Sequence, residues 1–390
     1  MMQMSRLSIW IAIASVIYRL APGEPSWMDP KDVFNLEHPL PPIGKTLAPA
    51  GNFSIQQFVG GDGSAVLVGR LYEPLASTTD LSTGSPLPPI VVIAHGLGLT
   101  QDCRLQPFVN AWLEEGLAVF TFDYTTFGWS PGWPRHQVIP TKHIADLKAA
   151  IAHIRQNLNR RVDATRIGLA GFSLGGGHVL SVAASDPNIR ATVAVVPHIR
   201  SGLEGILGTI WRDPLNANVG LVKVVMALFK GCIMACFQAF SSINTPHYIP
   251  LHGLPGSAAM MQNPGDYEGY GRLVQDLPSS LKWKNLASVW SVIPVLFYRP
   301  LNVVSQIRSS TLIIAAESDT LCPAADSQAA ADSMDSKITQ VITLEGLSHF
   351  DIYDGSPLQS VLEHSKNLFR RSLHLSVTFD DNHTSPDPLQ

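Results

Sequence analysis

The feature that most constrains the fold of this chain is the stretch from Arg166 to Gly177, with the sequence RIGLAGFSLGGG. It has the pattern of a short apolar strand, a tight turn and the start of a helix. Residues 171–175 fit G-x-S-x-G, a nucleophile elbow, in which glycines on both sides of a strained serine let strand and helix approach closely. The pattern predicts that Ser173 is a nucleophile at a helix N-terminus, where free N–H groups face the reacting carbonyl. The alternative is a glycine-rich turn with an ordinary serine.

The size and charge of the chain limit the classes of protein to which it can belong. It has 390 residues, of which 45% are hydrophobic and 15% are charged, which is enough for a large core in one enlarged domain. The net charge of −4 gives no electrostatic footprint for nucleic acid, so we expect no nucleic-acid partner. The mean hydropathy of +0.13 is high for a soluble protein and predicts an apolar pocket, a surface that touches a membrane, or both.

Strand-like and helix-like segments alternate along most of the chain. Residues 52–59 and 64–72 are strand-like and are joined by Gly60-Gly-Asp-Gly63, which predicts a hairpin. Apolar runs predict further strands, and segments with helical periodicity separate them. The strands are expected at 89–94, 118–123, 191–196, 311–315 and 338–344, and the helices include 141–158 and 357–373. This alternation predicts an α/β fold, a mostly parallel twisted sheet with helices on both faces.

The alternation breaks between two of these strands. Residues 219–243 are strongly apolar but contain Lys223 and Lys230, which would be unfavourable at mid-bilayer, so we expect helices there rather than a membrane span. Their position predicts a helical lid over the site, the alternative being extra core helices away from it. The predicted organisation is an N-terminal apolar segment and irregular arm (1–50), a first core part (51–197), the lid insertion (198–305), a second core part (306–373) and a disordered tail (374–390).

Acyl transfer through a serine needs a base, a carboxylate that orients the base, and donors for the oxyanion. Two acids, Glu317 and Asp319, follow the strand at 311–315, and Asp319 is preferred because it sits in the turn closed by Pro323. His349 follows the last strand and is the predicted base, which completes the order serine, acid, histidine. Asp351 is a weaker rival for the acid. The alternatives are a turn carboxylate at Asp319 and an ordinary surface histidine at His349.

The predicted oxyanion hole consists of two backbone N–H groups, those of Leu97 and Leu174. Leu97 follows a His-Gly turn, and Leu174 follows the nucleophile. His95 and His178 are predicted to be structural rather than second bases. Three aromatic residues between two of the predicted elements could line the pocket or pack in the core, and the sequence leaves both open: Tyr124, Phe127 and Trp129.

Five motifs, taken in order, resemble those of the α/β-hydrolase superfamily over residues 52–373. They are His95-Gly-Leu-Gly, Asp123-Tyr-x-x-x-Gly-x-Ser130, Gly171-Phe-Ser-Leu-Gly-Gly, Glu317-Ser-Asp319-x-x-x-Pro323 and Ser348-His349. Residues 162–177 resemble dienelactone-hydrolase-like members. The insertion, with Pro255-Gly-Ser and Pro264-Gly-Asp-Tyr, is similar to fungal polyketide transferases and thiohydrolases of secondary-metabolite clusters. That resemblance implies release of an acyl chain, carrier-bound on a polyketide synthase, to water or an alcohol.

We therefore expect a serine-dependent hydrolase or acyltransferase that cleaves an apolar acyl thioester or ester through an acyl-enzyme. One alternative is a secreted esterase or peptidase of the same fold, favoured by the apolar run at 7–17 and by glycosylation sequons at Asn52 and Asn382. Another is a non-catalytic binding protein of the hydrolase fold, which is disfavoured because such proteins usually lose a member of the serine–acid–histidine set.

Nothing in the sequence calls for a cofactor. No Cys/His spacing resembles a zinc site, and no glycine pattern meets G-x-G-x-x-G, so no metal or organic cofactor is expected. The four cysteines are widely scattered and do not form a disulfide framework, and Cys232 and Cys236 are expected to be packed on an apolar helix. This favours a cytoplasmic location over a secretory or membrane-associated one, although residues 7–17 leave membrane contact open.

Overall fold

The structure is a computed structural model that describes residues 53–63, 65–74, 86–212, 246–277 and 283–373, with positions 219, 221–226, 229 and 232 between them. The predictions of an N-terminal arm over residues 1–50, of a membrane-contacting run at 7–17 and of a disordered tail over 374–390 lie outside the described residues.

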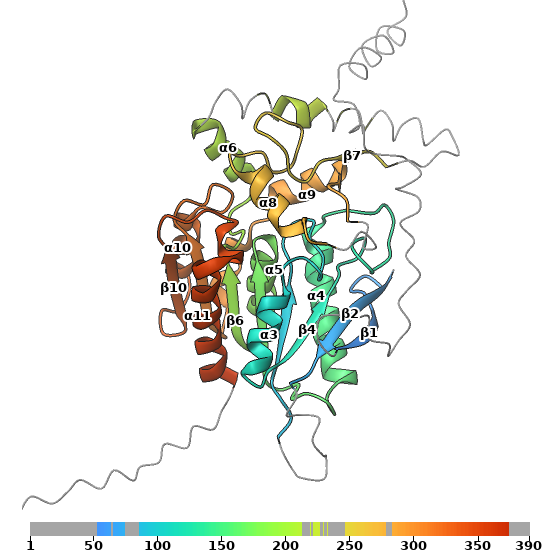
Figure 1. Ribbon diagram of the computed structural model, residues 1–390, viewed down its shortest axis with the longest axis vertical. Coiled ribbons are helices and arrows are strands. Elements are labelled where there is room, and N and C mark those ends of the chain that lie inside the picture. The colour runs from blue at the N-terminus through green and yellow to red at the C-terminus, as the bar shows by residue number, and fades with distance from the viewer. Residues whose placement is uncertain are drawn as a thin grey trace, which may run out of the picture.

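The centre of the molecule is an eight-stranded sheet in the order β1-β2-β4-β3-β5-β6-β9-β10 (Figure 1). β1 and β2 form an antiparallel hairpin, β2 pairs antiparallel with β4, and all other neighbours pair in parallel. The predicted hairpin and the mostly parallel sheet are thus confirmed. The strands are β1 (Phe53–Val59), β2 (Val66–Tyr72), β3 (Ile90–Ala94), β4 (Ala118–Phe122), β5 (Ile167–Phe172), β6 (Ile189–Val195), β9 (Ser310–Ala316) and β10 (Thr339–Leu344).

Helices cover both faces of the sheet because its central strands are apolar along their whole length. The core on one face is completed by α3 (Gln106–Glu114) and α11 (Gly355–Leu373). The core on the other face is completed by α4 (Pro140–Asn157), α5 (Leu174–Ser185) and α10 (Ala324–Asp332). Figure 1 shows α3 and α11 in front of the strands. The chain therefore has two apolar layers, one on each side of the sheet, as the alternating segments predict.

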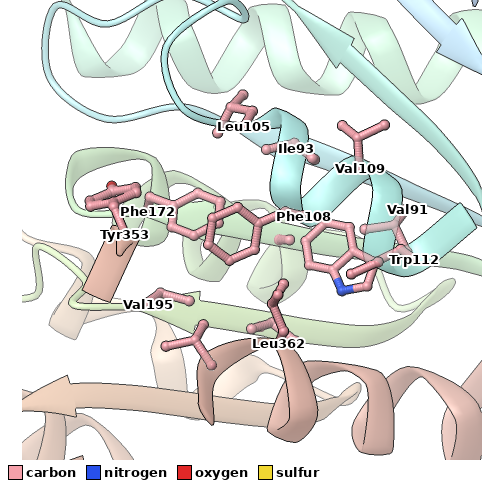
Figure 2. Close-up of a cluster of buried hydrophobic side chains, with 14 of the residues drawn as sticks. Val91, Ile93, Leu105, Phe108, Val109, Trp112, Phe172, Val195, Tyr353 and Leu362 are labelled. Atoms are coloured by element: carbon pink, nitrogen blue, oxygen red, sulfur yellow. The ribbon is translucent and has the colours of Figure 1, made fainter. Parts of the chain in front are cut away.

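Aromatic packing on the first face fixes the end of β5, as Figure 2 shows. The ring of Phe172 lies 4.5 Å from that of Phe108 in α3 and 5.8 Å from that of Tyr353. Trp112 packs beside Phe108 and donates a 3.1 Å hydrogen bond from Nε1 to Ser365 Oγ in α11. Burial of each of these rings contributes about 1.5–3 kcal/mol to stability. Since Phe172 immediately precedes Ser173, this cluster holds the serine turn in place.

The insertion between β6 and β9 forms a separate layer at one end of the sheet (Figure 1). Its action as a lid stays a prediction. Its described elements are α6 (Gly202–Arg212), β7 (Tyr248–Ile249), α8 (Asp266–Val274), β8 (Ala287–Ser288) and α9 (Val292–Phe297). The short 3-10 turns among the described residues are η3 (Val289–Ser291), η4 (Pro300–Asn302), η5 (Val304–Gln306) and η6 (Asp351–Tyr353).

The predicted packing of Cys232 is wrong, because this residue is exposed; Cys236 lies outside the described residues. The helical stretch before it also presents apolar side chains to solvent, with Val222 56% and Val225 54% exposed. An apolar stretch alone therefore does not place its cysteine in a core. Among the described helices, none combines the length and the apolar character that crossing a bilayer requires.

Candidate active site

Ser173 lies at the turn between β5 and α5. Its backbone has φ of 54° and ψ of −120°, a region that residues other than glycine rarely occupy. A Cβ built on Gly171 would lie 2.2 Å from the carbonyl oxygen of Gly175, and one built on Gly175 would lie 2.2 Å from that of Ala94. Both clashes are with backbone atoms, so no side-chain rotation relieves them. The turn is therefore strained at the serine and sterically closed to larger residues on both sides.

The side chains of Ser173, His349 and Asp319 form a hydrogen-bonded chain. His349 Nε2 lies 3.0 Å from Ser173 Oγ, and His349 Nδ1 lies 2.6 Å from Asp319 Oδ2. The other oxygen of Asp319 accepts hydrogen bonds from the backbone N–H groups of Leu321 and Cys322, at 2.8 and 2.7 Å. A carboxylate can only accept, so the ring proton is assigned to Nδ1, and Nε2 can take the serine proton. The fold thus brings together three groups that are far apart in the sequence.

The two rival acids bond elsewhere. Glu317 accepts a 2.8 Å hydrogen bond from the N–H of Gly346. Asp351 accepts the N–H and the hydroxyl of Ser348, at 2.8 and 2.6 Å, and pairs with Arg272 at 3.3 Å. Of the three acids that the sequence offers, the structure places Asp319 against the histidine.

Two opposing effects act on His349, which is buried. Burial alone would lower its pKa, because a charged ring loses its hydration. The charge of Asp319 and its hydrogen bond oppose this, and the balance raises the pKa of His349 well above its usual value. A base with a raised pKa accepts a proton from serine more readily, but it must be neutral to accept, so the same shift moves the pH range of activity upward.

Leu97 and Leu174 line the same cavity as Ser173. Within the described part of the chain, no hydrogen bond uses either backbone N–H, so both can serve an oxyanion. The loop that carries Leu97 is held from the insertion: the hydroxyl of Tyr270 donates to the Leu97 carbonyl at 2.7 Å, and Nε1 of Trp283 donates to the Gly98 carbonyl at 3.1 Å. The sequence missed these two donors because they carry no motif and lie far from this loop in the chain.

A cavity of about 240 Å³ opens beside Ser173. The insertion supplies most of its wall, which is largely apolar and includes Leu221, Val224, Met260, Met261, Val292 and Leu296. The three aromatic residues whose role the sequence left open do not belong to this wall. Tyr124 and Phe127 are fully buried in the core against α4 and α5, and Trp129 packs against the core on the opposite face.

Two histidines near the serine turn have structural contacts. Nδ1 of His95 lies 3.2 Å from the carbonyl oxygen of Gly96, and Nδ1 of His178 lies 2.9 Å from the hydroxyl of Tyr298. Burial lowers the pKa of His95 to about 4 and the pKa of His178 well below its usual value. Both rings are therefore neutral at physiological pH, and their described hydrogen bonds go to residues outside the Ser173–His349–Asp319 chain, consistent with the structural roles predicted for them.

Known proteins share this fold and sequence pattern. The family model for S33 serine aminopeptidases matches residues 86–227. The quorum-quenching protein AidA of Acinetobacter baumannii is 30% identical over 302 residues, which cover 77% of this chain and 90% of AidA. The chain belongs to the α/β-hydrolase family.

Other relatives of this α/β-hydrolase include a polyketide transferase, af380 of Aspergillus fumigatus, which is 25% identical over 290 residues and matches 73% of this chain and 90% of its own length. Among solved structures, the α/β hydrolase GrgF from Penicillium sp. sh18 superposes with a TM-score of 0.62 at 23% identity, over 83% of this chain and 99% of GrgF. The structural likeness supports the fold, and the sequence matches confirm the predicted resemblance to polyketide transferases.

Proposed function

We propose that the protein is a serine-dependent hydrolase or acyltransferase that cleaves an apolar acyl thioester or ester through an acyl-enzyme. The observation that carries the proposal is the hydrogen-bonded chain from Asp319 through His349 to Ser173, which ends on an apolar cavity. Family membership supports a hydrolase or transferase activity, and the geometry supports the serine mechanism.

In the proposed first step, Ser173 Oγ attacks the acyl carbonyl while His349 Nε2 takes its proton across the 3.0 Å hydrogen bond. Asp319 holds the ring in the required tautomer and stabilises the imidazolium that forms. The N–H groups of Leu97 and Leu174 bind the oxyanion. His349 then gives the proton to the departing thiol or alcohol, which leaves the acyl group on Ser173. Water or an alcohol completes the cycle by the same path in reverse.

The cavity wall supports an apolar acyl group. Most of its side chains are aliphatic or methionine, and its charged residues Arg200 and Asp326 pair with each other, so a chain of methylene groups would lose its contact with water there. Because a relative at 25% identity is named a polyketide transferase, we include a carrier-bound polyketide chain among the proposed donors, with a polyketide synthase as the partner that presents it.

The peptidase alternative has less support. An aminopeptidase needs a carboxylate for the ammonium group of its substrate. Among the residues that line the cavity, the acidic side chain is Asp326, and its Oδ1 accepts a 2.7 Å hydrogen bond from Nε of Arg200. The ammonium group would have to compete with this guanidinium.

A fluorophosphonate probe followed by mass spectrometry tests the nucleophile. We expect one adduct, on Ser173, that is lost in Ser173→Ala and formed much more slowly in His349→Ala. Ser181→Ala is the matched control, because Ser181 lies on the same helix but bonds to the carbonyl of Gly177 and to Tyr298. An adduct that persists in Ser173→Ala, or its absence from folded wild-type protein, would contradict the serine mechanism. Acyl thioesters and simple esters, with and without alcohol acceptors, then define the substrate.

A further inference from the structure

A cysteine lies against the acid and the base of this site. Cys322 follows Asp319 by three positions and is buried at the cavity wall beside His349. One ligand atom from each of Asp319, Cys322 and His349 lies within 4.8 Å of the other two. This cluster could not be predicted from the sequence, because the fold brings His349 to the other two residues from beyond β10. A carboxylate, a thiol and an imidazole are the ligands that zinc prefers.

We propose that Asp319, Cys322 and His349 bind Zn²⁺ and that the bound ion shuts off the Ser173 nucleophile. A tetrahedral zinc ion with bonds of about 2.0–2.3 Å holds its ligand atoms about 3–4 Å apart, so small side-chain rotations bring the three groups onto one ion. The cavity beside them supplies the fourth position, for a water molecule. The Cys322 thiol gives up its proton to solvent when the zinc–sulfur bond forms; a neutral imidazole keeps its one proton, and an imidazolium first releases one of its two protons to solvent.

An ion shared with Asp319 lies on the Nδ1 side of the ring, because Asp319 Oδ2 is 2.6 Å from Nδ1 whereas Nε2 faces Ser173. The ion then takes the place of the proton on Nδ1, and the neutral ring carries its proton on Nε2 instead. Nε2 donates to Ser173 rather than accepting from it, so the base is lost. Mg²⁺ is excluded as an equivalent inhibitor, because it requires oxygen ligands in octahedral geometry.

The binding arm of the test does not depend on the proposed function. Purified full-length protein is titrated with Zn²⁺ in equilibrium dialysis and with Co²⁺ as an absorbing substitute. We expect one zinc ion per chain and a Co²⁺ spectrum of the intense, tetrahedral type with a thiolate band. Cys322→Ala should weaken zinc binding at least about 10-fold and remove the thiolate band. Cys232→Ala is the control, because that cysteine is exposed and lies outside the cluster. No tight site, or equal binding in wild type and Cys322→Ala, would overturn the proposal.

The inhibition arm rests on the proposed function. The rate of fluorophosphonate labelling of Ser173 is measured with Zn²⁺, with Mg²⁺ and with a chelator, and each variant is compared with its own metal-free rate. We expect Zn²⁺ to slow labelling at least about 10-fold in wild type and in Cys232→Ala, to slow it far less in Cys322→Ala, and Mg²⁺ to have no effect. Zinc binding without slower labelling would overturn the inhibitory role. Absence of labelling in metal-free wild type would refute the serine mechanism instead, and the dialysis result would still decide the zinc site.

Discussion

The strained backbone at Ser173 predicts that a Ser173→Gly variant is more stable than a Ser173→Ala variant. With φ at 54° and ψ at −120°, any residue that carries a Cβ is strained at this position. The strain is of order 1–3 kcal/mol. Ser173→Ala retains it, and Ser173→Gly releases it. Both variants lose the same hydrogen bond to His349. The difference between the two variants therefore isolates the backbone contribution to the free energy of unfolding.

The magnitude follows from two opposing terms. Glycine has more conformational freedom in the unfolded chain, which offsets about 0.5–1 kcal/mol of the released strain. We therefore expect Ser173→Gly to be more stable than Ser173→Ala by about 1 kcal/mol, a change that urea unfolding resolves as a shift of the midpoint. The control is Ala329→Gly in α10, where the backbone is helical and the same chemical change should destabilise the protein by about 1 kcal/mol.

The outcome that would refute this reasoning is a Ser173→Gly variant that is no more stable than Ser173→Ala, or that loses stability as Ala329→Gly does. The turn would then not be strained in solution, and the account of the elbow as a conformation held by its surroundings would be wrong.

Three further predictions follow from the site and its surroundings. Asp319→Asn should fold normally but lower kcat by about 10⁴-fold. It should also lower the midpoint of the pH–rate profile, which in wild type lies above the ordinary histidine value because Asp319 raises the pKa of His349. An unchanged profile would contradict the role of the acid. Gly175→Ala should destabilise the protein by at least about 2 kcal/mol in urea unfolding, because its Cβ would meet backbone oxygens, whereas Gly271→Ala in α8, which has open space, should stabilise it by about 1 kcal/mol. Burial lowers the pKa of His143 to about 3. As the pH falls from 6 to 4, the free energy of unfolding of wild type should therefore fall by about 1.4 kcal/mol per pH unit relative to that of His143→Phe. Parallel pH–stability curves for the two proteins would refute this.

The sheet and its helices could be predicted because their signals are local. A strand buried on both faces is a continuous apolar run, so the prediction at 89–94 differs by one residue from the observed β3. The helix predicted at 141–158 is observed as Pro140–Asn157 for the same reason, since one side of it repeats with helical period. The strand order could not be predicted in this way, because β4 lies between β2 and β3 through pairings that leave no local pattern.

In the candidate site, too, some residues could be predicted from local sequence signals and others could not. Ser173, Asp319 and His349 stand at strand ends in a fixed order, so chain position alone singled them out, and the structure brings the three side chains together. Tyr270 and Cys322 were missed, because each depends on a contact between distant segments. The hydroxyl of Tyr270 reaches a loop 173 positions away, and Cys322 becomes a neighbour of His349 only when the two last strands pair.

The central claim is that the acyl group passes through Ser173. The most direct measurement is mass spectrometry of the protein quenched during turnover of an acyl thioester, with peptide mapping of the modified residue. The account predicts a mass increase equal to the acyl group, located on Ser173, that is absent from Ser173→Ala together with turnover. Turnover that continues in Ser173→Ala, or an acyl group found on another residue, would contradict it.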